Sequence, residues 1–385
     1  ARAAPAGAVH LNWPLREPLA PGASGLAAAA RAVASHGGRA GPPRLHPRRT
    51  KCDHGEVETL VALTREHEQG LICCGPMSTS PELRRAIAAF GRRAGWPVLA
   101  DPASNLRAPS EVEAAPIIDT GDLLARAPRF SQQMQPEVVV RVGDSPVSKA
   151  QRLWLEACDA REVVWVDRGG QWGEPSRRAT RVLRSEAEGL FAASAASLAA
   201  GPAEGADRVG SRWCRSFMEA DRVARAAVGR GDSRAVGLAV ATCVARSAPA
   251  GARLFASNSM SIRLLDLALS RPDAPLHVHC SRGASGIDGV TSTALGVAAA
   301  AAHGAAAGSS VPTLLLTGDL AFLHDLSGLL IAARESIPLT IVVLDDDGGG
   351  IFSFLPIAEQ GESVDFEALF QTPHRVDLAA IAPAL

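Results

Sequence analysis

The sequence predicts an α/β protein built from two doubly wound domains, each with a parallel sheet. Apolar, β-branched runs alternate with amphipathic helical stretches twice, first over residues 56–200 and again over 205–385. The runs are apolar nearly throughout, which is typical of strands buried on both faces of a parallel sheet. With 385 residues, of which 47% are hydrophobic, the chain has enough apolar material for two cores.

The first unit is predicted to alternate strand and helix in the order of a doubly wound sheet. Its strands are expected at 71–74, 97–100, 137–143 and 162–167, and its helices at 81–95 and 148–159. Strand segments such as LICC and EVVVRVG are short and apolar, whereas the helical segments between them are amphipathic. This alternation favours helices on both faces of the sheet.

The second unit follows a long helical stretch at 205–248 and repeats the same alternation. Its strands are expected at 254–257, 276–280, 312–318 and 338–344, and its helices at 261–270, 289–304 and 323–336. Before the first unit, residues 21–55 are rich in Pro, Gly and Arg without sustained periodicity, which predicts a linker.

Bulk composition narrows the possible partners and location. A net charge of -1 gives no electrostatic reason to expect nucleic acid or an anionic membrane as a partner. The Ala-rich run at 294–307 is too short and too weakly apolar to span a bilayer, and the first residues lack the apolar core of a signal peptide. Seven irregularly spaced cysteines do not form a disulfide framework, which favours a reducing, cytoplasmic location.

Chemistry-bearing residues gather at the predicted strand exits of the second unit. FASNSMSIR leaves a strand through Asn258 and Ser259, HCSRGASGIDG through Arg282, and LLLTGDLAF through Gly318 and Asp319. LDDDGGGIF is a fourth exit. In an open parallel sheet these loops line the ligand crevice, and helix N-termini there suit phosphate.

Asp319 and one of the three aspartates at 345–347 are candidates for a shared divalent cation with oxygen ligands. Glycines 348–350 would let the backbone approach the cation and a phosphate closely. The plainer interpretation is a solvated turn. An EF-hand is excluded, since Pro356 stands where the twelfth loop position needs Glu.

Taken in order, these segments resemble a known family. Gly-Asp-Leu, a helix and a strand, and then a pair like Asn-Asn resemble the thiamine diphosphate (thiamine pyrophosphate) fingerprint. SRGASGIDG, GDLAFLHDLSGLL and DDDGGGIFSFLP resemble the MenD family, the 2-succinyl-5-enolpyruvyl-6-hydroxy-3-cyclohexene-1-carboxylate synthases. Asp345-Asp346 departs from the Asn-Asn or Asn-Asp usual in that family, which leaves the metal preference open.

The resemblance implies a three-domain enzyme and a domain division for this chain. Residues 1–20, which contain AVHLNWPLREPL, would end the pyrimidine-binding domain, with the linker at 21–55. The central Rossmann-like domain would occupy 56–200 and the diphosphate-binding domain 205–385, without its C-terminal end. The family's activating glutamate would lie outside this sequence, so the fragment alone is expected to be inactive.

The resemblance also implies a metal and cofactor site. Asp319, Asp346 and the backbone carbonyl of Gly348 would bind Mg2+ or Mn2+, which clamps the diphosphate. The residues implied to contact thiamine diphosphate itself are Ser259, Gly318, Asp319, Leu320, Ala321, Ile287, Asp346, Gly348 and Gly349. Among them, Ile287 would be the bulky apolar side chain that bends the cofactor into its V shape.

The implied reaction is decarboxylation of 2-oxoglutarate and addition of the resulting succinyl-semialdehyde carbanion to isochorismate, in menaquinone or phylloquinone biosynthesis. Arg263 and Arg282 would face the substrate carboxylates, since the guanidinium fork binds carboxylates bidentately. Phe352 and Leu355 would form the apolar wall. The family's cofactor lies between subunits, which implies a homodimer or homotetramer.

Two alternatives stay open at this point. One is a different thiamine diphosphate enzyme, such as an acetolactate synthase relative, and the other is a non-catalytic diphosphate-binding module. Weaker candidates are a zinc site seeded by Cys52, Asp53 and His54, for which no second ligand pair follows, and the alternating His277 and His279.

Overall fold

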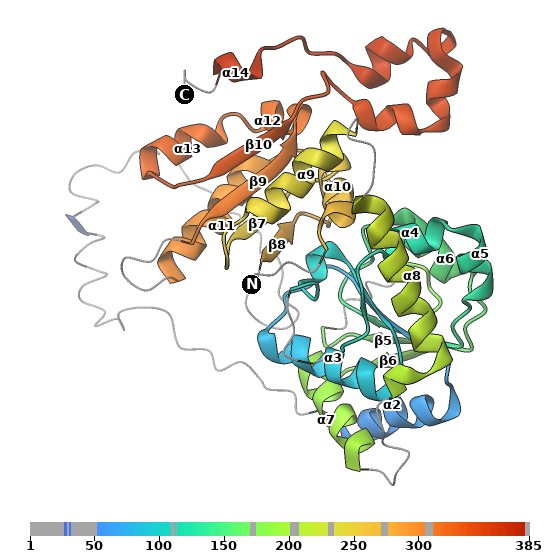
Figure 1. Cartoon of the computed structure of the whole chain (residues 1–385). Coiled ribbons are helices and arrows are strands. Elements are labelled where there is room, and N and C mark those ends of the chain that lie inside the picture. The colour runs from blue at the N-terminus through green and yellow to red at the C-terminus, as the bar shows by residue number, and fades with distance from the viewer. Residues whose placement is uncertain are drawn as a thin grey trace.

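The structure is a computed structural model that describes residues 27–28, 31, 52–108, 112, 114–169, 175–200, 208–229, 235–270, 276–304 and 311–381. The predicted end of a pyrimidine-binding domain at 1–20 lies outside these residues, and so does most of the predicted linker at 21–55. The described chain forms two α/β units, which confirms the predicted fold class (Figure 1).

The first sheet has six parallel strands in the order β3-β2-β1-β4-β5-β6. The strands are β1 (Gly70–Cys74), β2 (Val98–Ala100), β3 (Ile117–Ile118), β4 (Val138–Val142), β5 (Glu162–Val166) and β6 (Arg181–Leu183). The chain fills one half of the sheet and then the other from the pair β1 and β4, which is the doubly wound arrangement. The sequence does not predict β3 and β6, which have two and three residues; β2 is as short as β6 but coincides with the strand expected at 97–100.

Helices cover both faces of this sheet. The helices of this unit are α2 (His54–Glu66), α3 (Pro81–Ala94), α4 (Gly121–Arg126), α5 (Pro128–Gln133), α6 (Lys149–Ala157), α7 (Ala187–Ala200) and α8 (Arg212–Gly229), with the short η3 (Arg208–Gly210). A further short helix, η1 (Pro102–Ser104), follows β2 and packs toward the second unit. Local signals define α3 well: the Ser80 hydroxyl accepts from the Leu83 N–H, Pro81 opens the first turn, and Gly95 ends the helix in the left-handed region.

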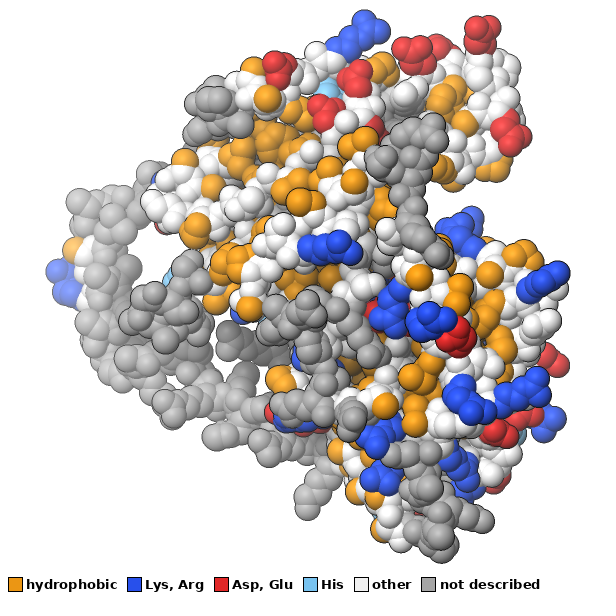
Figure 2. Space-filling model, viewed as in Figure 1, with side chains coloured by type: hydrophobic (Ala, Val, Ile, Leu, Met, Phe, Trp, Pro, Cys, Tyr) orange, Lys and Arg blue, Asp and Glu red, His pale blue; other side chains and the backbone are white. Residues whose placement is uncertain are grey.

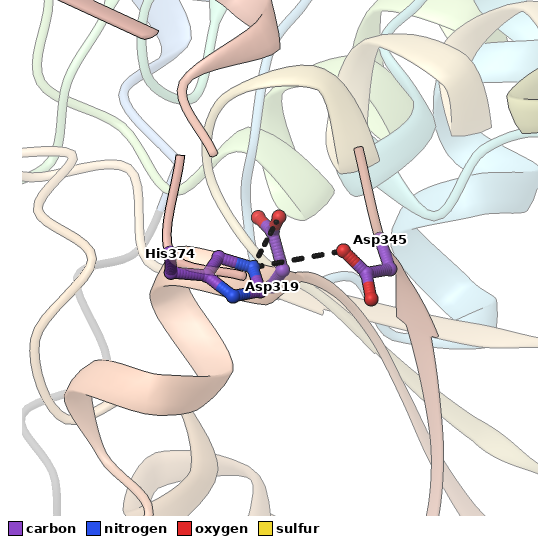
Figure 3. A group of neighbouring side chains, drawn as sticks. All are labelled: Asp319, Asp345 and His374. Atoms are coloured by element: carbon purple, nitrogen blue, oxygen red, sulfur yellow. Dashed lines mark hydrogen bonds and ion pairs between the residues drawn. The ribbon is translucent and has the colours of Figure 1, made fainter. Parts of the chain in front are cut away.

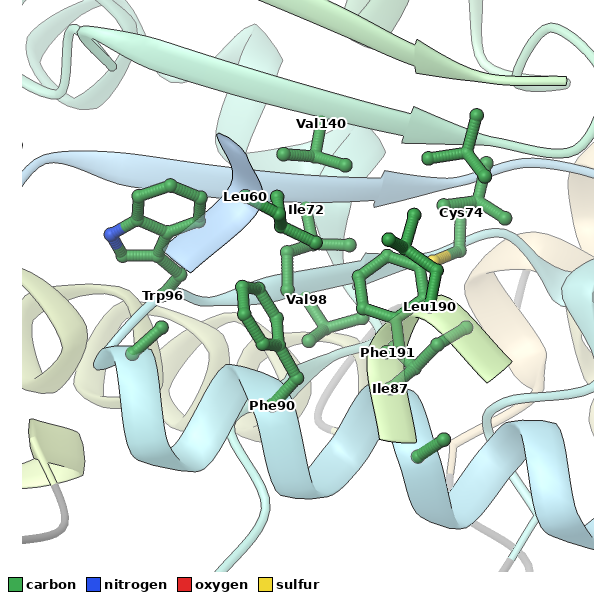
Figure 4. Packing of buried hydrophobic residues seen from close by; sticks show 14 of the residues in the cluster. Leu60, Ile72, Cys74, Ile87, Phe90, Trp96, Val98, Val140, Leu190 and Phe191 are labelled. Atoms are coloured by element: carbon green, nitrogen blue, oxygen red, sulfur yellow. The ribbon is translucent and has the colours of Figure 1, made fainter. Parts of the chain in front are cut away.

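Successive residues of β1, β2 and β3 supply two separate cores, as the pleat requires. Ile72 of β1 lies among side chains of α2, α3 and α7, such as Leu60, Phe90 and Phe191 (Figure 4). Its neighbour Leu71 faces the opposite layer, with Trp154 of α6 and with Trp213 and Phe217 of α8. Helix α8, from the helical stretch predicted at 205–248, therefore contributes to the core of the first sheet.

The second sheet has four parallel strands in the order β10-β9-β7-β8. The strands are β7 (Arg253–Ala256), β8 (His277–Cys280), β9 (Thr313–Gly318) and β10 (Thr340–Leu344), and the helices are α9 (Val236–Ser247), α10 (Met260–Ala268), α11 (Val290–Gly304), α12 (Asp319–His324) and α13 (Gly328–Glu335). Helices α9 and α10 cover one face, whereas α11 and α12 cover the other.

The single helix predicted at 323–336 is wrong, because the chain forms α12 and α13 with a turn between them. The Asp325 carboxylate accepts from the Ser292 N–H at 2.6 Å and from its hydroxyl at 3.0 Å, and so holds the turn against α11. Gly328 allows the close approach, since a Cβ there would lie 2.9 Å from Ser292 Oγ. Helix α12 also begins at Asp319, one turn earlier than predicted.

Beyond β10, the chain forms a series of short helices and then returns to the sheet edge. These elements are η4 (Gly350–Phe354), η5 (Pro356–Val364), η6 (Glu367–Gln371) and α14 (Leu378–Ile381). We call residues 366–376 the return segment. Within the described ranges, no helix is both long enough and apolar enough to cross a bilayer.

The two units touch through the loop after β2. The Asn105 side chain accepts from the Val278 N–H at 2.7 Å and donates to the Val278 carbonyl at 3.2 Å on β8. Arg107, which is buried, donates to the backbone carbonyls of Asp266 and Leu269 at 2.7 and 2.9 Å and pairs with the Asp266 carboxylate. These contacts fix α10 and β8 of the second unit against the first.

Candidate functional site

The carboxyl ends of β7, β9 and β10 meet at one edge of the second sheet. Ser259 follows β7, Asp319 follows β9 directly, and Asp345 follows β10, whose last residue Leu344 pairs with Gly318. The strand order changes direction between β7 and β9. Such a point is where open parallel sheets place their ligand crevice.

Asp319 is the most enclosed carboxylate of this edge, with 2% of the residue exposed. Its Oδ1 accepts from the Leu320 N–H at 2.6 Å, and its Oδ2 accepts from the Gly348 N–H at 2.7 Å. The Nε2 atom of His374, from the return segment, lies 3.0 Å from the same Oδ2 (Figure 3). The carboxylate is thus oriented by the N–H of the next residue and by two donors from distant parts of the chain, Gly348 and His374.

The three consecutive aspartates after β10 send their carboxylates in different directions. Asp345 Oδ1 accepts from the Asp347 N–H at 3.1 Å and lies 3.6 Å from His374 Nε2. Asp347, in the left-handed region with φ 55°, accepts from the Arg375 N–H at 2.7 Å. Asp346 instead lies over Gly350, where a Cβ would meet its Oδ2 at 1.9 Å.

The edge is electrostatically suited to a cation. Partial burial raises the pKa of Asp346, and the negative charges of Asp319 and Asp345 raise it further, although two backbone amides oppose the shift. A divalent cation would relieve that repulsion. On the face drawn in Figure 2, acidic side chains lie over the upper part of the molecule, which holds the C-terminal elements.

The glycines of this loop make room for the return segment. A Cβ on Gly348 would lie 2.1 Å from the Gln371 carbonyl oxygen, and one on Gly349 would lie 2.5 Å from that of Phe370. The Gly349 N–H also donates to the Gln371 carbonyl at 2.6 Å. The sequence predicts close approach to a cation and a phosphate here, whereas in this structure the closest neighbour is the chain itself.

Arg263 and Arg282 lie near each other at the same edge. Arg263 donates to the Ser259 carbonyl, and Arg282 donates to the Asn258 side chain at 3.1 Å. Burial lowers the pKa of Arg263, as do the positive charges of Arg282 and of Arg152 from α6. The Nε of Arg282 is buried and has no hydrogen-bond partner among the described atoms. Desolvated like charges of this kind favour an anionic ligand.

Of the remaining predicted site residues, some lie in the site and one does not. Ile287 packs against the apolar cluster of β7, β9, α11 and α12, which includes Ala321. The Leu320 N–H donates to the Asp319 carboxylate, and Gly318, the last residue of β9, directly precedes Asp319. Phe352 contacts Phe370, with ring centroids 5.9 Å apart. Leu355 is 44% exposed, so the structure does not bring it into an apolar wall with Phe352.

The weaker sequence candidates have structural roles. The Asp53 carboxylate caps α2 by accepting from the Gly55 N–H at 2.8 Å, and His54 pairs at 3.4 Å with the exposed Glu58. His277 and His279 have pKa values lowered first by burial and then by Arg253. Within the described ranges, one group of His, Cys, Asp or Glu side chains is spaced to hold a metal, and it comprises Asp319, Asp345 and His374.

His374 is the residue that sequence reasoning misses. It lies 55 residues beyond Asp319, in a segment without periodic pattern, yet its imidazole is 10% exposed and contacts the most buried carboxylate of the edge. The only signal in the sequence is a single histidine between Pro373 and Arg375.

Comparison with known proteins agrees with this geometry. The family described as "Middle domain of thiamine pyrophosphate" matches residues 50–256, and "Thiamine pyrophosphate enzyme, C-terminal TPP binding domain" matches residues 273–385. The second match covers β8 to β10 and therefore includes Asp319 and the loop after β10.

Similar curated proteins are 2-succinyl-5-enolpyruvyl-6-hydroxy-3-cyclohexene-1-carboxylate synthases. The one from Myxococcus xanthus is 39% identical over 98% of this chain, and the one from Chloroflexus aurantiacus is 37% identical over 99%. A third, from Geobacillus kaustophilus, is 38% identical over 98% of this chain. The chain spans 62% of the length of each of these relatives. Since the middle-domain match alone covers more than half of its residues, the chain belongs to the thiamine pyrophosphate enzyme family.

Proposed function

We propose that the chain is the central and cofactor-binding part of a 2-succinyl-5-enolpyruvyl-6-hydroxy-3-cyclohexene-1-carboxylate synthase. That enzyme would decarboxylate 2-oxoglutarate and add the remaining four-carbon unit to isochorismate. The observation that carries the proposal is identity of 37–39% with synthases of that name along nearly the whole chain. The paired arginines at the edge that carries Asp319 also suit substrates with several carboxylates.

The residues at this edge fit Mg2+ or Mn2+ and thiamine diphosphate. Asp319 is buried, and the pKa of Asp346 is raised first by burial and then by the negative charge of Asp319, which a cation would offset. In the proposal, Asp319, Asp346 and the Gly348 carbonyl hold the cation. To do so, Asp346 must turn away from Gly350, and the peptide at Gly348, with φ 135°, must present its carbonyl. Glycine tolerates that reorientation better than any other residue.

The diphosphate would lie between the exits of β7 and β9. We assign contacts with the diphosphate to residues that follow β7 and β9 and to one residue of the loop after β10. These residues are Ser259, Gly318, Leu320, Ala321 and Gly349. Ile287, which packs against the apolar cluster that includes Ala321, would support the thiamine rings. When bound, the cofactor supplies the electron sink for loss of carbon dioxide.

Arg263 and Arg282 would bind and orient substrate carboxylates. Burial lowers the pKa of Arg263 first, and the nearby positive charge of Arg282 lowers it further. Binding a carboxylate offsets both effects, so the pair is prepared for an anion before one arrives. Phe352 and Leu355 would form the apolar wall, for which Leu355 must move from its exposed position.

The cytoplasmic location and a homodimer or homotetramer belong to this proposal too. They follow from the likeness to the family and remain predictions. So do the domain boundaries expected at 56–200 and 205–385.

The natural gene product tests the reaction class. We expect it to turn over 2-oxoglutarate with isochorismate and to leave pyruvate alone. Arg263→Ala and Arg282→Ala should each cost about 1.5–3 kcal/mol in substrate use with cofactor binding retained. Turnover of pyruvate would favour the acetolactate synthase alternative, and binding of thiamine diphosphate without turnover of either acid would favour a non-catalytic module.

A titration with thiamine diphosphate and Mg2+ tests the metal ligands. Asp319→Ala and Asp346→Ala should abolish metal-dependent binding, whereas Asp346→Asn should retain it, because the amide oxygen still ligates. Asp345→Ala is the matched control from the same acidic run. Normal binding by Asp346→Ala, or a loss in Asp345→Ala as large as in Asp319→Ala, would show that a different aspartate ligates the cation.

A further inference from the structure

His374 is fixed by contacts on both of its ring nitrogens. Its Nδ1 accepts a hydrogen bond from the Val376 N–H at 3.0 Å, and its Nε2 lies 3.0 Å from Asp319 Oδ2. Nδ1 also lies 3.7 Å from Asp347 Oδ1, a distance too long for a hydrogen bond. Since Nδ1 acts as an acceptor, the neutral ring carries its proton on Nε2 and donates it to Asp319.

The return segment is held in place independently of the ring. The Gln371 carbonyl accepts from the Gly349 N–H at 2.6 Å, and the Arg375 N–H donates to Asp347 at 2.7 Å. Phe366 and Phe370 stack with ring centroids 5.6 Å apart. The imidazole therefore reaches Asp319 from a segment that other contacts have already ordered, and 10% of the side chain is exposed.

We infer that His374 is a positioning residue for the cation site, acting through the Nε2–H to Asp319 Oδ2 hydrogen bond. The inference rests on the proposed function, since it takes Asp319 to be a metal ligand. Two donors on Oδ2, from His374 and Gly348, fix the rotation of the carboxylate and leave its remaining lone pairs for a cation. Removing such a partner from a ligating group typically weakens metal binding about 10- to 100-fold.

The tautomer distinguishes positioning from ligation. A ring nitrogen can ligate a metal only with its lone pair, and the nitrogen that faces Asp319 carries the proton. His374 therefore acts on the cation through Asp319 and does not bind it. If His374 positions Asp319, His374→Gln should keep most of the function, because the glutamine amide N–H can donate to Asp319 over a similar distance. His374→Ala should lose the function, because it has no donor.

The test measures binding of Mn2+ to the chain in the presence of inorganic pyrophosphate, with free Mn2+ quantified by electron paramagnetic resonance. We expect His374→Ala to weaken binding about 10- to 100-fold and His374→Gln to recover most of the loss. Phe366→Ala is the matched control, since it removes one ring contact of the return segment but keeps the hydrogen bonds of Gln371 and Arg375 and every charge and donor near Asp319. It should bind Mn2+ as the unmodified chain does.

Several outcomes would overturn the inference. They are unchanged or tighter Mn2+ binding in His374→Ala, an equal loss in Phe366→Ala, and coupling of bound Mn2+ to an imidazole nitrogen in pulsed resonance spectra. Asp319→Ala separates this failure from that of the proposed function. If Asp319→Ala also binds Mn2+ normally, the metal site itself is wrong. If only Asp319→Ala loses binding, the site stands and the role of His374 falls.

Discussion

At the scale of one residue, Ser259 has a strained backbone conformation at the edge of the sheet that carries the candidate site. Its backbone has φ 67° and ψ -130°, a conformation that glycine adopts far more readily than serine. No hydrogen bond from the side chain caps α10, although serine is a favoured capping residue. Strained positions of this kind cluster at ligand sites. The strain agrees with the diphosphate contact proposed for the Ser259 hydroxyl.

We predict that Ser259→Gly stabilises the chain while weakening cofactor binding. Glycine relieves the strained conformation but adds entropy to the unfolded state, so the net gain should be about 0.5–2 kcal/mol. Urea unfolding measures the gain, and titration of the natural gene product with thiamine diphosphate measures the loss. A destabilised variant would mean that the serine side chain stabilises the fold more than its backbone strains it.

At the scale of elements, the loop after β10 and the return segment behave as one unit. The three glycines adjoin groups that leave no room for a Cβ, and the aspartates distribute their carboxylates among separate donors. Like charges on adjacent residues are tolerated because Asp345 and Asp347 each accept a backbone N–H while Asp346 turns toward Gly350. The acidic run therefore has a structural role in holding the return segment, in addition to any role in binding a cation.

We predict that Gly348→Ala detaches the return segment. The new Cβ would fall 2.1 Å from the Gln371 carbonyl, and alanine is also disfavoured at φ 135°. Limited proteolysis should cut the variant within residues 366–376 much faster than the unmodified chain. Gly210→Ala is the control, since a Cβ there meets nothing within 4 Å. Equal cleavage of both variants would mean that the segment does not depend on this close approach.

Strand β8 leads to a prediction about pH. Burial lowers the pKa of His279 below its ordinary 6.5, and the charges of Arg253 and His277 lower it further. His277 is lowered by burial, Arg253 and Arg84. Below pH about 6.5 the unfolded chain therefore binds protons that the folded chain does not, so these two groups reduce stability as the pH falls.

The measurement is the urea midpoint at pH 7.5 and at pH 5.5, compared with that of the double variant His277→Gln/His279→Gln. The unmodified chain should lose more stability on acidification than the double variant does. The comparison cancels buried carboxyls such as Asp266, whose pKa burial raises and whose contribution therefore has the opposite sign. Identical losses would show that neither histidine is kept neutral by folding.

The sequence predicts elements well where a segment is long enough to show a period or is uniformly apolar. Strands β1, β4 and β10 could be predicted for that reason, and so could the short, apolar β2, whereas β3 and β6 are not predicted. The aspartates could be predicted to share an edge with Asp319, because the carboxyl ends of parallel strands lie together. His374 and Arg107 could not, because their partners lie 55 and 159 residues away and are set only by the folded path of the chain.

At the scale of the whole molecule, the two α/β units are joined by a buried ion pair. The Arg107 guanidinium of the first unit donates to the carboxylate of Asp266. It also donates to three backbone carbonyls, those of Ala100, Asp266 and Leu269. Asp266 lies in α10, three residues after Arg263. The docking contact therefore also holds the helix that carries one of the proposed substrate arginines.

We predict that Arg107→Met destabilises the chain by about 3–5 kcal/mol, because it leaves the buried Asp266 carboxylate unpaired. The double variant Arg107→Met/Asp266→Leu should recover part of the loss, since it removes the orphaned charge. Urea unfolding of both variants measures the effect. Arg222→Ala, which breaks an exposed pair with Glu219, should leave the unfolding midpoint unchanged. A similarly small effect in Arg107→Met would mean that the units dock without this pair.

Asn105 has a consequence for behaviour in concentrated solution. Strand β8 is the last strand of its sheet, and the free N–H and carbonyl of such a strand can recruit a strand from another molecule. Asn105, held at φ 58°, places its amide group against both polar atoms of Val278 and imitates the neighbour that β8 lacks. A side chain of the first unit thus occupies part of the β8 edge and should lower its tendency to pair with a strand of another molecule, whereas β10, the other edge strand of this sheet, gains no cover from it.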